Sequence, residues 1–155
     1  MAPATEYIDD SAGVAEDAQN DLASAYNYAA GLTATGTLPS DMGGSTFSPG
    51  VHNNSAAVGL SSNMTLNANG DPDAVFVFQI GAALTTTAGQ ITLENGAQAR
   101  NVYWQVATSA TIGTPFVGTI MATDSITLGT GIRFQGRALA KTASIVLVDN
   151  TVTAP

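Results

Sequence analysis

The sequence predicts a mainly β protein, an irregular β-solenoid with one long helix packed along one face. Short runs of β-prone residues, broken by glycine, fill residues 75–150, and their uneven spacing fits stacked coils better than the equal blades of a propeller. An alanine-rich stretch with helical periodicity comes before these runs. A length of 155 residues suits one core, so we expect residues 1–155 to form a single domain.

The chain begins with a predicted lead-in over residues 1–12 and a helix over residues 13–31. Asp9, Asp10 and Ser11 are candidate caps for the first turn of this helix. Apolar residues then recur in steps of three and four, which places them on one stripe. The stripe consists of Ala15, Ala18, Leu22, Ala25 and Ala29. Because it is mostly alanine, it can lie close to a flat sheet, and Gly31 is the expected C-cap.

Residues 32–74 are rich in turns that separate short strands, whereas residues 75–150 are predicted to form the solenoid coils. The strand candidates of this second part are residues 75–80, 90–93, 102–106, 116–121, 125–128, 132–134 and 144–148. Several runs superpose as degenerate rungs, each followed by a second run that contains threonine or serine. Residues 151–155 are a short tail.

The second runs of the coils are predicted to present small hydroxyl side chains to solvent. Side chains alternate along a strand, so if Ile126 and Leu128 face the core, Thr127 faces out. The outward set predicted in this way is Thr85, Thr87, Thr111, Ser125, Thr127 and Ser144. Stacked coils would turn this set into a flat, regular grid that can match a repeating solid. Threonine is also common on solvated sheet faces for its strand propensity alone, which is the competing explanation.

The first runs are predicted to turn an apolar face outward, which the helix must then cover. This outward set is Val75, Val77, Ala107, Val117, Met121 and Leu139. It is too apolar to leave in water, so we expect the alanine stripe to lie over it. The aromatic residues Phe76, Phe78, Trp104 and Phe116 fall on the inward side by the same alternation. They are therefore expected to be core residues, not a stacking platform for bases or sugars.

Composition makes several classes of partner unfavourable. The net charge is −8, with four Lys and Arg against twelve Asp and Glu, which opposes binding to nucleic acid or to an anionic membrane surface. Cysteine is absent, so neither disulfides nor thiolate metal sites are available. No apolar run is long enough to span a membrane, and the first residues lack the features of a signal peptide. We expect a soluble chain in which any export signal has been removed or was never present.

Candidate catalytic and metal-binding residues are few, and we expect no enzyme activity, cofactor or metal. His52 is the single histidine, and no Gly-x-Ser-x-Gly motif accompanies it. The alternating Asn and Asp of residues 67–73 lack the glutamate that completes a calcium loop, and a turn explains them better. Glu94, Asp124 and Asp149 are too far apart in the chain to indicate the paired carboxylates of a glycosidase.

Several ordered segments resemble the microbial and fungal ice-binding protein family. They are AEDAQNDLASAY (15–26), FSPGV (47–51), LNANGDPDAVFVFQI (66–80), ITLENGA (91–97), VYWQV (102–106), SATIGT (109–114), GTIMA (118–122) and GRALA (136–140). The resemblance implies a right-handed triangular β-solenoid with a long helix alongside. It also implies a secreted or cell-surface protein that is not an enzyme and adsorbs to ice through a flat face, here assigned to the hydroxyl grid. Members of the family also occur as modules of adhesins.

The sequence departs from the family at its start. Family members usually carry a further block of solenoid strands before the helix, whereas about a dozen residues precede it here. We therefore expect one end of the solenoid to be unpaired and open to strand addition. The alternative function is thus a structural subunit of an extracellular filament, surface layer or adhesin, which pairs with other copies of itself. Residues 4–8 or 151–153 are the candidate donated strands.

Overall fold

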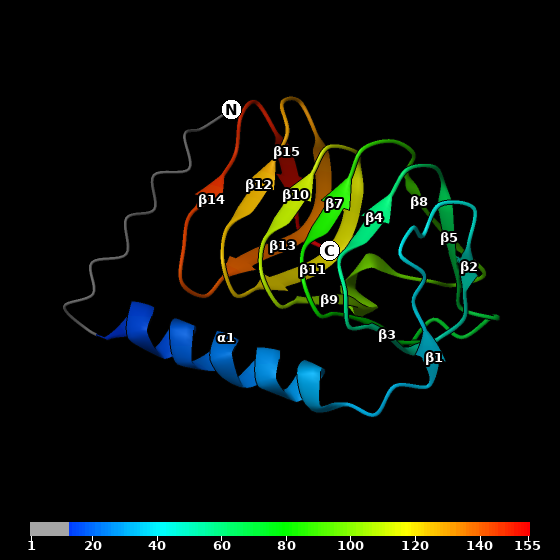
Figure 1. Cartoon of the computed structure of the whole chain (residues 1–155), viewed down its shortest axis with the longest axis horizontal. Helices are drawn as coiled ribbons and strands as arrows, with labels where there is room; N and C mark the ends of the chain where they lie inside the picture. Colours follow the sequence, from blue (N-terminus) through cyan, green and yellow to red (C-terminus); the bar gives the residue numbers. More distant parts are fainter. Residues whose placement is uncertain (1–12) are drawn as a thin grey trace.

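The computed structural model describes residues 13–155 as a three-sided β-solenoid with one helix along one side (Figure 1). Three parallel sheets form the sides, and we name them sheets A, B and C. Sheet A has the order β1 (Gly36–Thr37), β3 (Gly50–Asn54), β6 (Phe76–Ile80), β9 (Val102–Val106), β11 (Phe116–Ala122), β13 (Arg133–Ala140) and β15 (Thr151–Thr153). The predicted fold class, a mainly β solenoid with one long helix on one face, is confirmed.

The other two sheets are smaller. Sheet B has the order β14 (Ile145–Val146), β12 (Ile126–Leu128), β10 (Ala110–Ile112), β7 (Leu84–Thr86) and β4 (Val58–Leu60). Sheet C has the order β2 (Thr46–Phe47), β5 (Met64–Asn67) and β8 (Ile91–Glu94). After β10 and β12 the chain returns directly to sheet A, without a strand in sheet C, which makes the coils unequal.

The interior of the solenoid is filled by aromatic and aliphatic side chains from all three sheets. Phe78 stacks on Trp104 with ring centroids 4.2 Å apart, and Phe116 lies 4.9 Å from Trp104 on the other side. Trp104 is fully buried, and its indole N–H donates to the carbonyl of Val117 at 2.9 Å. Phe76 is fully buried as well, so the prediction that these four aromatic residues belong to the core is confirmed.

The close approach at Trp104 requires glycine at position 118. Gly118 has a φ of 101°, which side chains rarely adopt, and a Cβ there would lie 2.9 Å from the indole nitrogen of Trp104. Val117, the preceding residue, packs partly buried against the solenoid core and does not belong to the cluster formed by the helix, so the prediction that it faces the helix is wrong.

Helix α1 (Val14–Gly31) packs on the outer surface of sheet A. Leu22 and Ala29 are its buried residues, and they form a cluster with Val77 and Met121, against which Leu139 is partly buried. The helix therefore covers Val77, Met121 and Leu139, as predicted. Val75 is 45% exposed, and neither it nor Ala107 belongs to this cluster, so those two predictions are wrong. Val75 directly precedes β6 and Ala107 directly follows β9, so both lie just outside the strands of sheet A.

The alanine stripe is only partly buried. Ala18 and Ala25 are exposed, contrary to prediction. Both line a groove between α1 and β13, so the helix does not press this part of the stripe onto the sheet. The stripe that makes contact is Leu22, Tyr26 and Ala29 instead.

The ends of the helix also differ from prediction. Gly13, with a φ of 71°, is the N-cap, so none of Asp9, Asp10 and Ser11, which lie outside the described residues, holds that position. At the other end Gly31 is the last helical residue, and the C-cap is Leu32 in an extended conformation. No helix among the described residues is long and apolar enough to cross a membrane.

Candidate functional site

The outer surface of sheet B carries a row of threonines in register. Thr111 stands opposite Thr85 on one side and Thr127 on the other, in parallel pairs. Thr85 and Thr111 are exposed and Thr127 is half-buried, whereas their neighbours along each strand are buried. Adjacent strands lie about 4.8 Å apart, so the row repeats at that distance. Gly59 and Val146 continue the row at its two ends.

A second row of small residues runs beside the threonines, two positions earlier in each strand. Backbone hydrogen bonds extend the ladder to these positions. The N–H groups of Leu84, Ala110 and Ile126 donate to the backbone carbonyls of Ser109, Ser125 and Ser144, at 3.0, 3.0 and 3.1 Å respectively. The row consists of Ala57, Ala83, Ser109, Ser125 and Ser144. Ser109 was not among the predicted residues, although counting back two positions from Thr111 finds it.

A third row lies two positions after the threonine row. It consists of Ser61, Thr87, Gly113 and Gly129. The structure therefore brings all six predicted residues to one surface, distributed over three rows. Thr85, Thr111 and Thr127 share the central row, Ser125 and Ser144 lie in the second, and Thr87 lies in the third. Glycine replaces the hydroxyl group at two positions of the third row.

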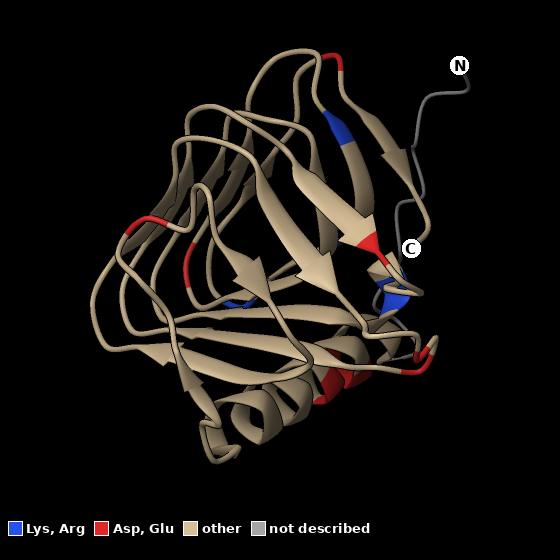
Figure 2. Cartoon of the chain, turned by 90° about the vertical axis from the view of Figure 1, so that its right-hand side faces the viewer, with Lys and Arg blue, Asp and Glu red and all other residues tan. Residues whose placement is uncertain are grey.

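The three rows contain no charged side chain, and the carboxylate of Asp41 lies at their β4 end, where Asp41 pairs with Gly59 and accepts from the Ser61 hydroxyl. None of the residues in the three rows is ionisable, and Figure 2 shows charged residues at corners, on the helix and near strand ends, with the sheets mostly neutral. The rows consequently offer methyl and hydroxyl groups only. A charged or phosphorylated partner would find no ionic contact within them.

Hydrogen bonds beneath the surface hold the strands of sheet B together. Thr86 points inward, in a position where the neighbouring strand has Ile112, and its hydroxyl accepts the Gly113 N–H at 3.0 Å. The buried hydroxyl of Thr114 donates to the same oxygen at 2.9 Å. These bonds tie the corner after β10 to β7. A surface fixed from below in this way loses little conformational entropy when it binds a solid.

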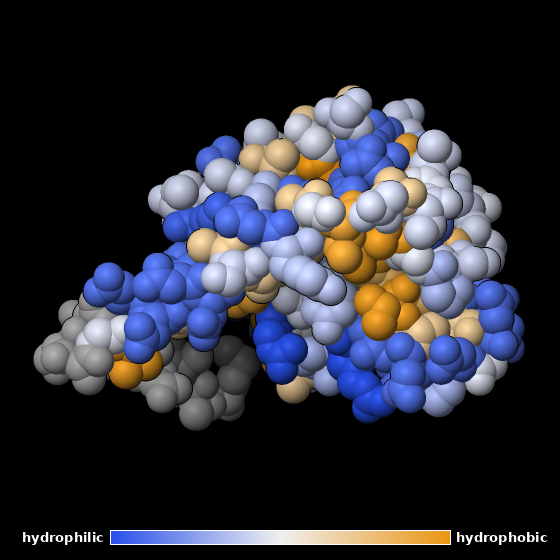
Figure 3. Space-filling model, turned by 90° about the horizontal axis from the view of Figure 1, so that it is seen from below, coloured by the Kyte–Doolittle hydropathy of each residue, from blue (hydrophilic) through white to orange (hydrophobic). Residues whose placement is uncertain are grey.

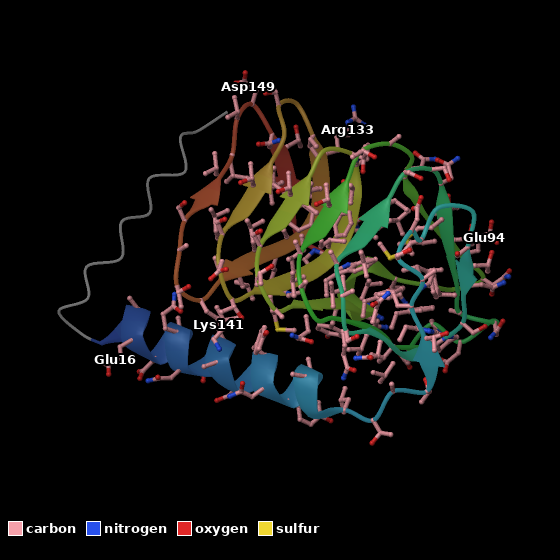
Figure 4. The ribbon with its side chains drawn as sticks, in the orientation of Figure 1. Glu16, Glu94, Arg133, Lys141 and Asp149 are labelled. Carbon is pink, nitrogen blue, oxygen red and sulfur yellow. The ribbon has the colours of Figure 1, made fainter. Side chains whose placement is uncertain are left out.

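The candidate catalytic and metal-binding residues have structural roles. The His52 ring stacks on Phe78 at 5.6 Å between centroids, and its Nε2 lies 2.9 Å from the carbonyl oxygen of Ser48. Asn67 and Asp71 each accept the N–H two residues ahead, at 2.8 and 2.9 Å, which confirms the predicted turn. Glu94 and Asp149 lie at opposite ends of the solenoid (Figure 4). Within residues 13–155, His, Asp and Glu form no group of three suited to a metal ion.

Comparisons with known proteins agree with this geometry. The model of a family described as ice-binding-like matches residues 2–153. An ice-binding protein of Nostoc sp. (strain HG1) is 43% identical over 144 residues, which are 90% of this chain and 54% of the relative. Ice-binding protein 1 of Shewanella frigidimarina (strain NCIMB 400) is 40% identical over 144 residues, which are 87% of this chain and 16% of the relative.

Solved structures of similar proteins share the fold. An ice binding protein from an Antarctic biological consortium superposes with a TM-score of 0.86 at 41% identity, over 90% of this chain and 66% of that one. The DUF3494 domain of the Shewanella frigidimarina protein gives a TM-score of 0.88 at 35% identity, over 97% and 67% of the two chains. The present chain thus spans about half the length of the Nostoc relative, 54%.

Proposed function

Because this chain belongs to the ice-binding-like family, we propose that it adsorbs to ice through the outer surface of sheet B. The observation that carries this proposal is the register of Thr85, Thr111 and Thr127, which form one straight row of uncharged side chains. Their methyl groups and hydroxyls repeat at a constant spacing, as the groups of a crystal face do.

The other two sides of the solenoid are less suitable for this role. Helix α1 covers part of the outer surface of sheet A. Sheet C has three strands, and its outer surface includes the exposed Glu94. Sheet B combines five strands with three rows of uncharged side chains, and its nearest charge, Asp41, lies at the β4 edge. Adsorption to a neutral solid depends on shape and on ordered water, so an even surface of this kind is the favourable one.

Adsorption without chemistry is the mechanism that follows. The protein attaches to the growing crystal and carries out no reaction, so we infer that it is not an enzyme and needs no cofactor. The flat surface must meet ice where ice forms, and we therefore place the protein in the water outside the cell or at the cell surface.

The Thr127→Tyr variant tests the proposed surface. Thr127 lies in the central row, half-buried, and a tyrosine there would stand above the plane and keep the neighbouring threonines from contact with ice. We expect crystal shaping and inhibition of recrystallisation to fall by at least about tenfold, while urea denaturation shows a stability change within about 0.5 kcal/mol.

Thr92→Tyr is the matched control. Thr92 pairs with Thr65 in sheet C and, like Thr127, is half-buried. This variant should shape ice crystals as the wild type does. Wild-type activity in Thr127→Tyr would rule out sheet B as the binding surface, and a wild-type protein that leaves ice crystals unshaped would contradict the proposed function itself.

A further inference from the structure

The central threonine row of sheet B changes character at its β4 end. Gly59 stands opposite Thr85 and has no side chain, and Asp41 stands opposite Gly59 in a parallel bridge. Asp41 therefore occupies the next position of the same row. Asp41 is exposed and the following residue, Met42, is buried, so alternation turns the carboxylate outward, to the same side as the threonines. The row thus ends in a gap and then a charge.

Three hydrogen bonds hold the carboxylate of Asp41 in this position. Its Oδ1 accepts from the N–H groups of Gly43 and Ser61, at 2.9 and 3.1 Å. Its Oδ2 accepts from the Ser61 hydroxyl. All three donors are neutral, so they fix the charge without cancelling it. The bond to Oδ2 also occupies the one proton of the Ser61 hydroxyl, which is the β4 member of the third row.

The β4 level consequently offers little to ice. Ala57 contributes a methyl group to the second row, Gly59 contributes no side chain to the central row, and the Ser61 hydroxyl already donates to Asp41. A carboxylate binds water firmly, and its removal from water is costly. Ice in contact with this level would have to accommodate the hydration water of Asp41 directly beside the gap at Gly59.

We propose that Asp41 and Gly59 set the boundary of the ice-binding surface, which begins at Thr85 and does not include β4. This inference rests on the proposed adsorption of ice to sheet B and adds which strands take part. They are β7, β10 and β12, the three strands that carry the central threonines. Asp41 keeps its own hydration water over the β4 level, and Gly59 leaves the first threonine without a neighbour on that side.

The other charges of the described chain lie outside the three rows. Glu94 is exposed on sheet C, and Asp124 lies one position before Ser125, at the corner between sheets A and B. Figure 3 looks at the side that carries α1 and shows the hydrophilic outer surface of the helix. Residues 151–153, considered above for donation, pair with β13 in the chain's own sheet A, and residues 4–8 lie outside the described residues. Asp41 is therefore the charged residue in register with the central row.

Asp41→Asn tests the charge. The variant keeps the shape of the side chain and its Oδ1 acceptor, but a neutral amide is removed from water at lower cost than a carboxylate. We expect the lowest concentration that inhibits ice recrystallisation to fall by at least about threefold, measured at neutral pH with the full chain. Glu94→Gln is the matched control, because it removes one exposed carboxylate from sheet C and should keep the value of the wild type.

Gly59→Thr tests the gap. A Cβ at this position would lie 3.6 Å from the carbonyl oxygen of Thr85 and 3.7 Å from that of Ser40, which are ordinary contacts. A threonine therefore fits, and it extends the central row by one strand. We expect the inhibiting concentration to fall by about twofold or more, because more of the surface then meets the ice.

Circular dichroism establishes that each variant is folded, and should Asp41→Asn not fold, Gly59→Thr decides alone. An active wild type with a folded Asp41→Asn that gains no activity would overturn the boundary, as would a gain of equal size in Glu94→Gln. A folded Gly59→Thr without a gain would overturn the role of the gap. A wild type that leaves ice unshaped would contradict the proposed function instead, so the two failures are distinguishable.

Discussion

Thr86 shows how one polar residue in the core can stabilise the surface above it. Its side chain points inward in sheet B, and it stands in register with Leu60 of β4 and Ile112 of β10. The hydroxyl is nevertheless satisfied, because it accepts from Gly113 N–H and from the Thr114 hydroxyl. Buried polar groups with partners of this kind specify one arrangement of neighbouring strands.

Replacement of Thr86 by valine keeps the volume and removes the acceptor. The Thr114 hydroxyl, 6% exposed, would then be left without a partner. We expect the free energy of unfolding to fall by about 1–3 kcal/mol, measured by urea denaturation with Trp104 fluorescence as the signal. Thr85→Val, one residue away on the exposed side, should change stability by no more than about 0.5 kcal/mol. Equal effects of the two variants would argue against the buried pair.

At the scale of elements, α1 is attached to sheet A by specific hydrogen bonds as well as by apolar contact. The side-chain amide of Gln79 donates to the carbonyls of Ala29 and Leu32, each at 2.8 Å, and so serves the end of the helix that lacks a left-handed glycine cap. Further along, Gln105 donates to the Tyr26 hydroxyl at 2.8 Å. Few large side chains join the helix to the sheet, so these bonds carry much of the attachment.

Gln79→Leu should therefore loosen the helix more than the solenoid. The carbonyls of Ala29 and Leu32 would lose their donor in a partly buried position. We expect amide hydrogen exchange in α1 to accelerate by about tenfold or more, with little change in β9 and β11. Gln98→Leu is the matched control, because Gln98 bonds to the Pro72 carbonyl at 2.8 Å far from the helix. Faster exchange throughout the sheets would show that Gln79 supports the whole fold instead.

At the scale of the whole molecule, residues 38–45 fold over one end of the solenoid, which we call the closed end, and Leu38 and Met42 there are 3% and 0% exposed. Asp41 contributes to the closed end, and its hydrogen bond with the Ser61 hydroxyl, followed by that with the Gly43 N–H, lowers the pKa of the carboxyl below its ordinary value of 3.8. A carboxylate whose pKa is lower in the folded state than in the unfolded state stabilises the fold at pH values above the pKa of the unfolded state. That stabilisation disappears as pH falls through the folded value.

Asp41→Asn should make the closed end less sensitive to acid. Between about pH 5 and about pH 2, the free energy of unfolding of the wild type should decrease more steeply than that of the variant. Denaturation in urea across this range measures the two slopes. Parallel slopes for Asp41→Asn and the wild type would contradict this role.

Some parts of the fold could be predicted from the sequence, and others could not. Local periodicity was sufficient to identify the helix and the outward side of each threonine-bearing run, because both depend on residues close together in the chain. It was insufficient at Val117, which packs against the core, and at Ala18, which is exposed beside a groove between α1 and β13. Neither feature has a signal in the spacing of apolar residues.

The sequence by itself determined that Thr85, Thr111 and Thr127 point away from the core, since a strand repeats every two residues. Only the tertiary structure decided that these three stand directly opposite one another, that Ser109 joins the row of Ser125 and Ser144, and that residues 38–45 fold over one end of the solenoid. Register between coils is set by corner geometry and by core packing among residues far apart in the chain, and these act together only once the chain has folded.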